Sequence, residues 1–421
     1  MLFALSAFFG WKSIQLDVSN AYLYGTLKET VYMELPEGFF HHERSQNRVL
    51  KLKKALYGLK QSGRIWNNLL DSYLKSLGFV QCELDYCLYQ KEHMGNVIMV
   101  LVYVDDILAF GSNETTLDKF RNDMKTRFKM KDMGKPKYVL GIKVEHQHEG
   151  SIKLSQPLYI KDILERSQLA DTKSKSTPME AKLSLEKSEI GKQADSKTMS
   201  DYRSHVGMLM YAAVCTRPDI AFPMSQVSKF VANPSSDHIA ASKRIFQYLK
   251  GTENYGLVYS KEDSPLKLIV YCDADYAGDR DDAKSTSGFC VSLAGAAISW
   301  KSQKQQTVAL SSTESEYTAL TEVTKDIMWV HGVLEFLGVT INMPTIVYED
   351  NQAAIKLSQN PVNHQRMKHV HTKFHFTRNK VKEGIISLTY VPTDEMVADT
   401  LTKSLAAPSF TRFRNSMGVR P

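Results

Sequence analysis

Cysteine is scarce in this chain: there are five cysteines in 421 residues, and no two of them have CxxC spacing. An odd number without that spacing argues against a disulfide-stapled scaffold and a zinc ribbon, so we expect reduced thiols in an intracellular protein. Long hydrophobic runs are also missing. No segment approaches the roughly 20 apolar residues that a membrane helix requires, so we expect no membrane span. The apolar opening run, 1–11, has no Lys or Arg ahead of it and no clear cleavage site, which predicts a buried helix rather than a signal peptide.

The composition shows no bias toward disorder or a fibrous repeat. Hydrophobic residues make up 43% and charged residues 24% of the chain, with 22 glycines and 13 prolines, which is close to average usage. The length predicts two or three domains, because one hydrophobic core seldom serves so many residues. The net charge of +7 suits a nucleic-acid partner, but many proteins without such a partner are equally basic.

Strand and helix patterns both occur along the chain, which predicts an α+β fold. Between about 171 and 200 large apolar residues become scarce while Lys, Ser, Glu and Asp accumulate, so we predict a solvated linker there. The predicted strands are 13–17, 97–103, 266–272, 287–293 and 345–348. The predicted helices are 65–77, 117–128, 202–211, 236–249, 315–337 and 351–357.

Two adjacent carboxylates, Asp105 and Asp106, stand between the apolar runs 97–104 and 107–110, as at the tip of a β-hairpin. Burying two charges there would be costly without compensation. Mg²⁺ would supply it, because this hard cation prefers carboxylate oxygens and leaves positions open for phosphate oxygens. The alternative is a hairpin turn in which both aspartates face water, since Asp favours turns.

A second acidic signal lies upstream, where a predicted strand ends in Asp17 and Tyr22 follows five residues later. Together with the Tyr-x-Asp-Asp hairpin this pattern resembles the palm of reverse transcriptases. The resemblance implies that Asp17, Asp105 and Asp106 hold two Mg²⁺ ions, with Mn²⁺ as a substitute. It also implies that Tyr22 closes against the sugar of the incoming nucleotide. Taken singly, Asp17 could cap a helix and Tyr22 could be a core aromatic residue.

The segment 56–64 is similar to the Leu-Tyr-Gly-Leu-Lys-Gln-Ser-Pro-Arg motif of copia-type reverse transcriptases, which lies near template and nucleotide. Gly63 replaces the proline, which implies a more flexible start of the helix that follows. The resemblance assigns Tyr103 and Lys60 to the nucleotide and Arg64 to the nucleic acid. For both basic residues, an exposed basic helix face is the alternative.

Four further acids follow one another in a recognisable order. Asp273 lies on a predicted strand and Glu316 on the predicted helix after it. Asp350 comes after a later predicted strand, and Asp399 lies in a late predicted helix. This order resembles ribonuclease H, and the resemblance implies that the four acids share two Mg²⁺ ions for hydrolysis of the RNA strand of an RNA–DNA hybrid. Singly, they have plainer explanations: a capping box of Thr313 with Glu316, a helix cap at Asp350, or a solvated helix residue at Asp399.

Two glutamates compete for the helix position in this second site. Glu314 and Glu316 are two residues apart, so a helix points them to different sides and only one should reach the metals. We choose Glu316, because the Glu-x-x-Ala step of the family matches Glu316 and Ala319.

The segment 368–378 is basic and aromatic, as a surface that follows a nucleic-acid backbone should be. The residues assigned to nucleic-acid binding are Lys368, Lys373 and Arg378. The histidines whose role stays open are His369, His371 and His375. Zinc bound by the i, i+4 pair of histidines is an alternative, although no Cys or Glu completes an evident ligand set.

Taken together, these motifs are similar to those of copia-type retrotransposon Pol polyproteins over nearly the whole chain, including 215–220, 248–252 and 398–403. The segment 138–142 also resembles the strand that grips the primer in this family. The resemblance implies a reverse transcriptase palm and thumb with truncated fingers, followed by a ribonuclease H-like α/β domain with a mixed sheet. The predicted domains are the palm and thumb (1–170), the polar linker (171–200), a helical connection region (201–264), the ribonuclease H-like domain (265–405) and a tail (406–421).

The function implied by the resemblance is an RNA-directed DNA polymerase with ribonuclease H activity, from an element that also integrates DNA. Its partners would be an RNA template, a DNA primer, an RNA–DNA hybrid and dNTPs, and its location intracellular, in the cytoplasm, with particles or the nucleus left open. Family members have further fingers residues ahead of the position of Met1, so two alternatives stay open: ribonuclease H activity alone, and a non-enzymatic remnant that binds nucleic acid. The oligomeric state is open as well.

Overall fold

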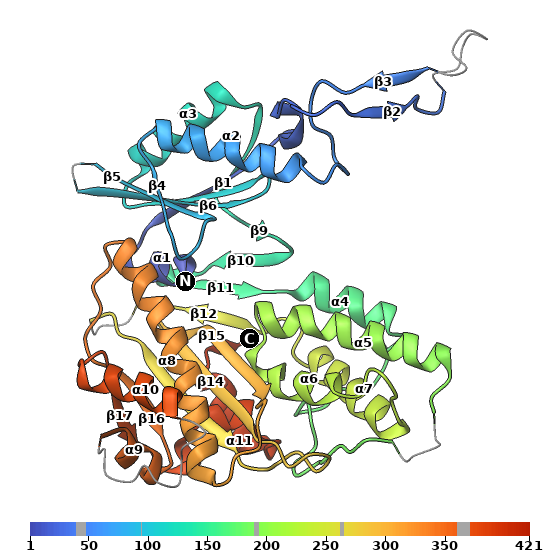
Figure 1. Ribbon diagram of the computed structural model, residues 1–421, viewed down its shortest axis with the longest axis vertical. Helices are drawn as coiled ribbons and strands as arrows, with labels where there is room; N and C mark the ends of the chain where they lie inside the picture. Colours follow the sequence, from blue (N-terminus) through green and yellow to red (C-terminus); the bar gives the residue numbers. More distant parts are fainter. Residues whose placement is uncertain (39–47, 94, 189–192, 262–264, 360–370) are drawn as a thin grey trace. The chain divides into compact units, whose positions relative to one another are not determined.

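The computed structural model describes residues 1–38, 48–93, 95–188, 193–261, 265–359 and 371–421 (Figure 1). The chain divides into two compact units. The small unit is Trp11–Pro136, and the large unit combines Met1–Gly10 with Lys137–Pro421. Both units mix helices with strands, so the predicted α+β class is confirmed. Among the described residues, no helix has both the length and the apolar character needed to cross a membrane.

The small unit is built on one antiparallel sheet. Its elements are β1 (Lys12–Val18), η1 (Ala21–Tyr24), β2 (Tyr32–Glu34), β3 (Val49–Lys51), α2 (Ser62–Ser76), β4 (Val80–Gln81), β5 (Leu88–His93), β6 (Asn96–Tyr103), β7 (Asp106–Gly111), α3 (Glu114–Arg127) and β8 (Met130–Gly134). Six strands pair in the order β4-β5-β6-β7-β1-β8, while β2 and β3 form a separate hairpin. Helices α2 and α3 lie on the same face of the six-stranded sheet (Figure 1).

Helix α2 shows why this face is covered. Trp66, Leu70 and Leu74 recur at i, i+4 and i+8, and all three are buried in one core with residues of α3 and the sheet. This spacing places them on a single apolar stripe of the helix. The helix predicted over 65–77 is therefore present, and it begins three residues earlier, at Ser62.

The large unit contains two five-stranded sheets, β18-β12-β11-β10-β9 and β15-β14-β13-β16-β17. Its helices are α1 (Leu2–Phe9), η3 (His148–Gly150), α4 (Pro157–Arg166), α5 (Ser196–Cys215), η4 (Pro218–Ile220), α6 (Ala221–Ser228), α7 (Ser236–Lys250), α8 (Ser312–Phe336), α9 (Gln352–Gln359), α10 (His371–Lys382), η6 (Thr393–Glu395), η7 (Val397–Leu401) and α11 (Ala407–Ser416). Its strands are β9 (Tyr138–Val139), β10 (Ile142–His146), β11 (Ile152–Ser155), β12 (Gly256–Tyr259), β13 (Ile269–Asp275), β14 (Thr286–Leu293), β15 (Ala296–Lys304), β16 (Thr345–Glu349), β17 (Ile386–Tyr390) and β18 (Val419–Arg420).

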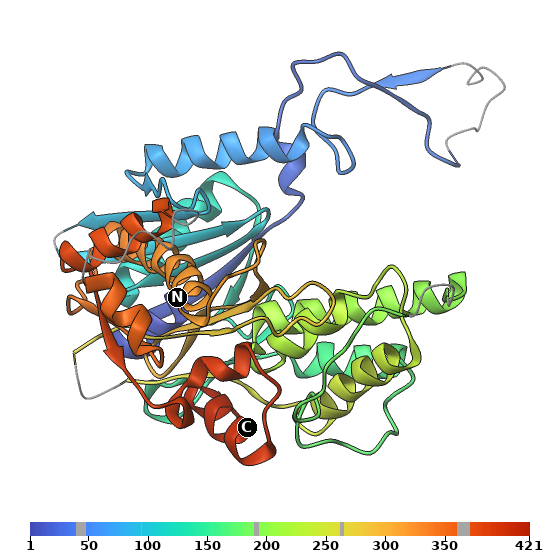
Figure 2. The same ribbon diagram turned by 60° about the horizontal axis from the view of Figure 1, so that its bottom comes forward.

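The second of these sheets is mixed, as predicted. Strand β13 pairs antiparallel with β14 and parallel with β16, and β16 pairs parallel with β17. Helix α8 lies across one face of this sheet (Figure 1). The helices α5, α6 and α7, drawn in green, gather to one side of it (Figure 2), and α6 packs against the edge strand β15.

The predicted linker is shorter and less exposed than its composition suggests. Helix α5 already begins at Ser196, because the side chain of Asp195 accepts hydrogen bonds from the backbone N–H groups of Lys197 and Thr198. Within the stretch predicted to be solvated, Thr177 to Met179 are buried. The hydroxyl of Thr177 accepts a hydrogen bond from Arg244 in α7. The predicted domain boundaries themselves stay a prediction.

A buried ion pair connects two motifs of the predicted connection region. The guanidinium of Arg217 donates to both carboxylate oxygens of Asp219, at 3.0 and 2.7 Å. The same guanidinium donates to the backbone oxygen and the hydroxyl of Thr252, and the Tyr248 hydroxyl donates to Asp219 at 2.6 Å. Arg217 and Asp219 are fully buried. Every polar group of the pair therefore has a partner, as a charge removed from water requires.

A second ion cluster joins α6 to the mixed sheet. The carboxylate of Asp279, whose side chain is 5% exposed, accepts from Lys229 at 2.9 Å and pairs with Lys304 at 2.8 Å. Lys229 follows α6 and Lys304 ends β15. Burial by itself would raise the pKa of Asp279, but the two ammonium groups outweigh it and hold that pKa well below its usual range.

This cluster predicts a stability that depends on acid pH. A carboxyl whose pKa is depressed in the folded state contributes stability above its unfolded pKa of about 3.9, and this contribution is lost as the pH falls further, through the folded pKa. We expect Asp279→Asn to lower the free energy of unfolding by about 2 kcal/mol at pH 7, and the gap to the parent to narrow below about pH 4. Urea unfolding followed by circular dichroism between pH 7 and 3 measures this. Asp162→Asn, in an exposed pair with Arg166, is the control. A gap that stays constant down to pH 3 would contradict the assignment.

Candidate active sites

The first candidate site lies in the small unit, where β1 meets the β6–β7 hairpin. Asp17 on β1 is the register partner of Asp106 on β7. Tyr103 and Asp106 are the last pair of the β6–β7 ladder, and Asp105 occupies the turn between them. The structure therefore brings Asp17, Asp105 and Asp106 together at one end of the sheet. Asp17 is a strand residue, so its alternative as a helix cap is wrong.

The carboxylates of this site are half-buried, and that of Asp106 accepts from a neutral side chain. The Gln15 side chain donates from Nε2 to Oδ1 of Asp106 at 3.3 Å. Burial raises the pKa of Asp106, the Gln15 hydrogen bond opposes this, and the charges of Asp105 and Asp17 add to the increase. Three acids at such close quarters repel one another, and a bound cation would relieve that repulsion.

The hairpin turn carries backbone strain next to the acids. Val104 has φ of +56°, in the left-handed region that β-branched residues seldom adopt. The indole N–H of Trp66 donates to the backbone oxygen of Val104 at 2.5 Å. Trp66 thus connects the second turn of α2 to the hairpin tip. The predicted helix 65–77 contains Trp66 without a role for it, because a hydrogen bond between residues 38 positions apart leaves no local signal in the sequence.

Two tyrosines stand beside these acids. The rings of Tyr22 and Tyr57 are 4.5 Å apart between centroids and tilted by 43°. Burial and the nearby charge of Asp105 raise the pKa of Tyr57. Tyr57 lies in the motif 56–64 but had no predicted role, and it is 54% exposed. Its contact with Tyr22 makes it part of the candidate site. A Cβ atom on Gly63 would lie 3.8 Å from the Tyr22 hydroxyl, which is ordinary contact, so the space at this position accepts a side chain.

The predicted contact residues around this site are exposed. Tyr103 is 57% exposed. Lys60 and Arg64 are exposed residues just before and within the first turn of α2. Their exposure is compatible with both the phosphate contact and the plain basic surface considered above.

The second candidate site lies in the large unit. Asp273 is on β13, Glu316 is in the second turn of α8, and Asp350 directly follows β16. Because β13 and β16 are parallel neighbours, their carboxyl ends lie at the same edge of the sheet. One carboxylate oxygen from each of these three residues lies within 4.8 Å of the other two. This group, with Asp273 and Glu316 buried, has the donor set of a site for a hard divalent cation.

The start of α8 separates the two competing glutamates. Ser311 is the N-cap of this helix, and its hydroxyl accepts from the backbone N–H of Glu314. The Glu314 carboxylate turns back and accepts from the backbone N–H of Leu310 at 2.8 Å. The capping role considered for Thr313 with Glu316 is therefore wrong. Glu316 faces the acids instead, and its Oε2 has no hydrogen-bond partner among the described residues.

Glu349 is an additional buried acid that the sequence reading missed. It is fully buried, its Oε1 accepts from the backbone N–H of Asn351 at 3.1 Å, and its Oε2 lacks a partner within the described part of the chain. Burial, with the neighbouring carboxylates, raises the pKa of Glu349 well above its usual range and that of Glu316 to about 11. Strand alternation was a usable signal, since Thr345, Val347 and Glu349 share the buried face of β16.

Asp399 reaches this site on the short helix η7. It is buried, and its Oδ1 accepts from Lys403 Nζ at 2.9 Å. Burial and the charge of Asp273 raise the pKa of Asp399 to about 7, while Lys403 opposes the increase. The alternative of a solvated helix residue is wrong for Asp399. Asp399 is not one of the three acids whose oxygens converge. Its carboxylate faces Lys403.

The segment after Asp399 approaches the sheet unusually closely. Gly288 on β14 is the register partner of Asp273, and a Cβ atom there would lie 2.6 Å from a methyl group of Thr402 and 2.8 Å from the Cβ of Leu401. The absence of a side chain at Gly288 therefore allows the approach. It lets the Thr402 hydroxyl donate a hydrogen bond to Oδ2 of Asp273.

The structure describes only part of the basic segment 368–378. Lys368 and His369 lie outside the described residues, and the side chains of Lys373 and His371 in α10 are likewise not described. The predicted role of Arg378 in nucleic-acid binding requires an exposed side chain. Arg378 is instead 3% exposed and lies near Tyr317 of α8. Helix α10 packs its face with Arg378 against α8, so this side chain is not available to a nucleic-acid backbone.

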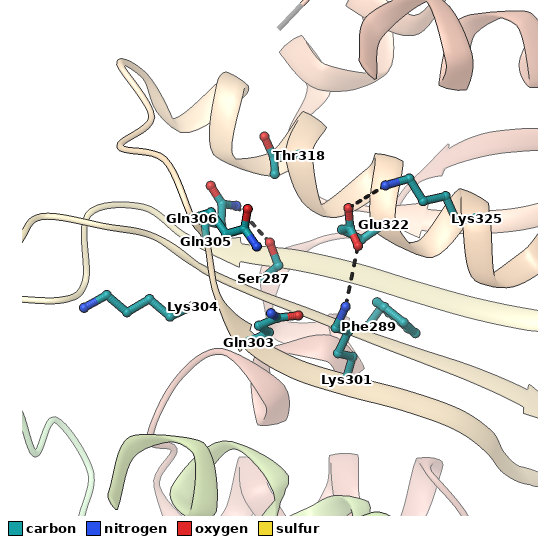
Figure 3. Close-up of a pocket in the computed structure, with 10 residues that line it drawn as sticks. All are labelled: Ser287, Phe289, Lys301, Gln303, Lys304, Gln305, Gln306, Thr318, Glu322 and Lys325. Atoms are coloured by element: carbon teal, nitrogen blue, oxygen red, sulfur yellow. Dashed lines mark hydrogen bonds and ion pairs between the residues drawn. The ribbon is translucent and has the colours of Figure 1, made fainter. Parts of the chain in front are cut away.

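A polar pocket of about 380 Å³ lies between α8 and the strands β14 and β15 (Figure 3). Its lysines have carboxylate partners. Lys301 and Lys325 both pair with Glu322, at 3.5 and 2.9 Å, and Lys304 extends toward Asp279. Gln305 is tied to Ser287 and to the α8 backbone. Since these charges are neutralised locally, the pocket does not form a concentrated anion site.

Comparisons with known proteins extend over nearly the whole chain. Residues 1–181 match the family described as "Reverse transcriptase (RNA-dependent DNA polymerase)". The chain is 41% identical over 409 residues to the retrovirus-related Pol polyprotein from transposon RE1 of Arabidopsis thaliana, covering 97% of this chain and 27% of that protein. It is 40% identical to the Pol polyprotein from transposon TNT 1-94 of Nicotiana tabacum, over 96% of this chain and 31% of that protein.

A shorter relative is matched from end to end. The putative transposon Ty5-1 protein of Saccharomyces cerevisiae is 33% identical over 314 residues, which is 74% of this chain and 100% of that protein. Among solved structures, a foamy viral protease-reverse transcriptase in complex with an RNA/DNA hybrid superposes with a TM-score of 0.46 at 14% identity, over 93% of this chain and 45% of that one. A superposition this loose identifies neither fold nor function.

Proposed function

The chain belongs to the copia-type family of retrotransposon Pol polyproteins, and from that premise we propose that it carries two phosphoryl-transfer sites. The site in the small unit would serve RNA-directed DNA synthesis, and the site in the large unit would serve ribonuclease H cleavage. The observation that carries the proposal is the convergence of acids in each unit: Asp17 with Asp105 and Asp106 in one, and Asp273 with Glu316 and Asp350 in the other. We also propose the residue ranges 1–170, 201–264 and 265–405 for the polymerase, the connection and the ribonuclease H-like domain.

Both groups of acids fit Mg²⁺, two ions per site, with Mn²⁺ as a substitute. Three converging carboxylates, among them Glu316 with its unpartnered Oε2, present the oxygen ligands that a hard divalent cation prefers. Asp399 would complete the ligand set there. When bound, the ions would activate the attacking oxygen and stabilise the leaving group.

Other residues near the acids of the small unit would bind the nucleotide or orient the carboxylates. Gln15 holds the carboxylate of Asp106 in place, and Tyr22, packed on Tyr57, would close against the sugar of the incoming nucleotide. Tyr103 and Lys60 would contact the nucleotide. Because both are exposed, a substrate could reach them without any rearrangement of the core.

The proposed partners are an RNA template, a DNA primer, their hybrid and dNTPs. Arg64 is exposed on α2 and would contact the nucleic-acid backbone. Lys368 and Lys373 are proposed for the hybrid in the large unit. The backbone of Lys373 lies in the first turn of α10.

One assay tests both activities together. The purified chain is incubated with a labelled RNA–DNA hybrid that has a recessed primer end, with Mg²⁺ and nucleotides, and primer extension and RNA cleavage are scored in the same reaction. We expect both products, and neither when the metal is chelated. Cleavage without extension would leave only the ribonuclease H, and salt-sensitive binding without turnover would contradict both activities.

Trp66→Phe tests how the hairpin tip is held. Phenylalanine keeps the aromatic packing of α2 but removes the donor to the backbone oxygen of Val104. We expect primer extension to slow about tenfold, as the loss of one hydrogen bond of roughly 1–1.5 kcal/mol implies, with little change in thermal stability. Tyr73→Phe is the matched control, because it removes another side-chain donor of α2, to the backbone oxygen of Asp123. Equal extension rates for the parent and Trp66→Phe would show that the hairpin turn keeps its conformation without the hydrogen bond from Trp66.

A further inference from the structure

Lys403 places an ammonium group between two of the buried acids of the large unit. Its Nζ lies 2.9 Å from Oδ1 of Asp399 and 3.4 Å from Oδ2 of Asp273. The two carboxylate side chains are 7% and 1% exposed, whereas the lysine side chain is 33% exposed. The acids are therefore enclosed, while the cation that neutralises them borders on solvent.

The local structure sets this arrangement. Lys403 follows Asp399 by four residues, and its backbone N–H donates to the backbone oxygen of Asp399 at 2.9 Å. The side chain of Lys403 is therefore directed back over the same turn. Thr402 anchors the segment by donating to Asp273, and Gly288 provides the room. Asp399 consequently directs its oxygen to the ammonium group and stands apart from the three acids that converge.

We propose that Lys403 is an internal counter-cation of the metal site: it holds Asp273 and Asp399 together while no divalent ion is bound, and it competes with that ion for the same carboxylate oxygens. This inference rests on the proposed metal-dependent function of the large unit. Binding of the ion would release the ammonium group to solvent and free Asp399 to turn toward Asp273. Lys403 would thereby set how tightly the site holds its metal.

The direction of the effect follows from electrostatics. A positive charge within a few ångströms of a divalent ion opposes binding of that ion, and the opposition is stronger in a poorly hydrated site than in water. The same charge stabilises the metal-free state, in which buried carboxylates repel one another. The ion pair of Arg217 with Asp219 differs, because both partners are fully buried and the cation has no path to solvent.

The test compares Lys403→Met, which keeps the aliphatic stem, with Lys403→Arg, which keeps the charge. We expect Mn²⁺, titrated by calorimetry into the metal-free full chain, to bind Lys403→Met on the order of tenfold more tightly than the parent. We also expect that variant to melt at a lower temperature without metal and to gain more in melting temperature from Mn²⁺. Lys403→Arg should stay close to the parent. Lys325→Met, which breaks a pair with Glu322 on α8, is the control and should leave Mn²⁺ affinity unchanged.

A second measurement uses the parent chain and does not depend on the folding of any variant. Acetylation of lysines, read by mass spectrometry, should modify Lys403 several-fold faster once Mn²⁺ is added, while Lys325 reacts at a constant rate. Unchanged reactivity of Lys403, or equal Mn²⁺ affinity in the parent and Lys403→Met, would overturn the inference. If Asp350→Asn binds Mn²⁺ in calorimetry as the parent does, the bound ion lies elsewhere, and the proposed function of this site fails instead.

Discussion

Replacing Asp105 with Asn is expected to abolish primer extension and to leave RNA cleavage at the level of the parent. Asn is nearly isosteric with Asp and is equally suited to a turn, so the hairpin between Tyr103 and Asp106 should keep its register. What is lost is one of three carboxylate charges. Because a metal-bound transition state is stabilised by several kcal/mol, we expect a loss on the order of 10³-fold or more in the rate of extension.

The variant Asp350→Asn tests whether each activity depends on its own group of acids. Asp350→Asn removes a charge from the acids of the large unit, and we expect it to abolish cleavage while extension continues. Asp118→Asn, on the exposed surface of α3, controls for the loss of a carboxylate as such. Both rates are measured on one hybrid substrate in the presence of Mg²⁺. If Asp105→Asn and Asp350→Asn both behaved like the parent, the assignment of the two sites would be wrong.

The acids of the small unit were predictable because their positions follow from strand geometry. Alternation of apolar residues identifies two adjacent strands of a hairpin, and an aspartate pair between them falls at its tip. A further strand ending in an acid places Asp17 at the same edge once it pairs with β7. What the sequence could not reveal is the support behind the tip. The hydrogen bond from Trp66 to Val104 exists only after α2 has packed on the sheet.

In the large unit the sequence identified four acids. It did not show that the oxygens of three of them converge while the fourth, Asp399, pairs with Lys403. Glu349 was missed because adjacent acids after a strand read as one polar loop, although strand alternation puts Glu349 on the buried face. The role of Lys403 depends on the close approach at Gly288, which no periodicity reports. Arg378 was misread as a surface cation because basic residues are usually exposed, whereas here α10 turns it toward α8.

The largest loss of stability is expected from Asp219→Ala in the helical part of the large unit. Removing this carboxylate leaves the Arg217 guanidinium fully buried with only the two Thr252 acceptors, and it removes the acceptor of the Tyr248 hydroxyl. Breaking a buried pair on one side costs about 3–5 kcal/mol, because the remaining charge stays out of water without compensation.

Removing both charges together separates the cost of an orphaned charge from the value of the pair. In the double variant Arg217→Met with Asp219→Leu no charge is stranded, so we expect much of the lost stability to return. The free energy of unfolding, measured by urea titration at pH 7, compares the two variants with the parent. Asp162→Asn, which breaks an exposed pair with Arg166, should cost no more than about 1 kcal/mol. If Asp219→Ala were as mild as Asp162→Asn, water would have to reach Arg217 in the folded chain, and the two motifs that meet there would not be held together by this pair.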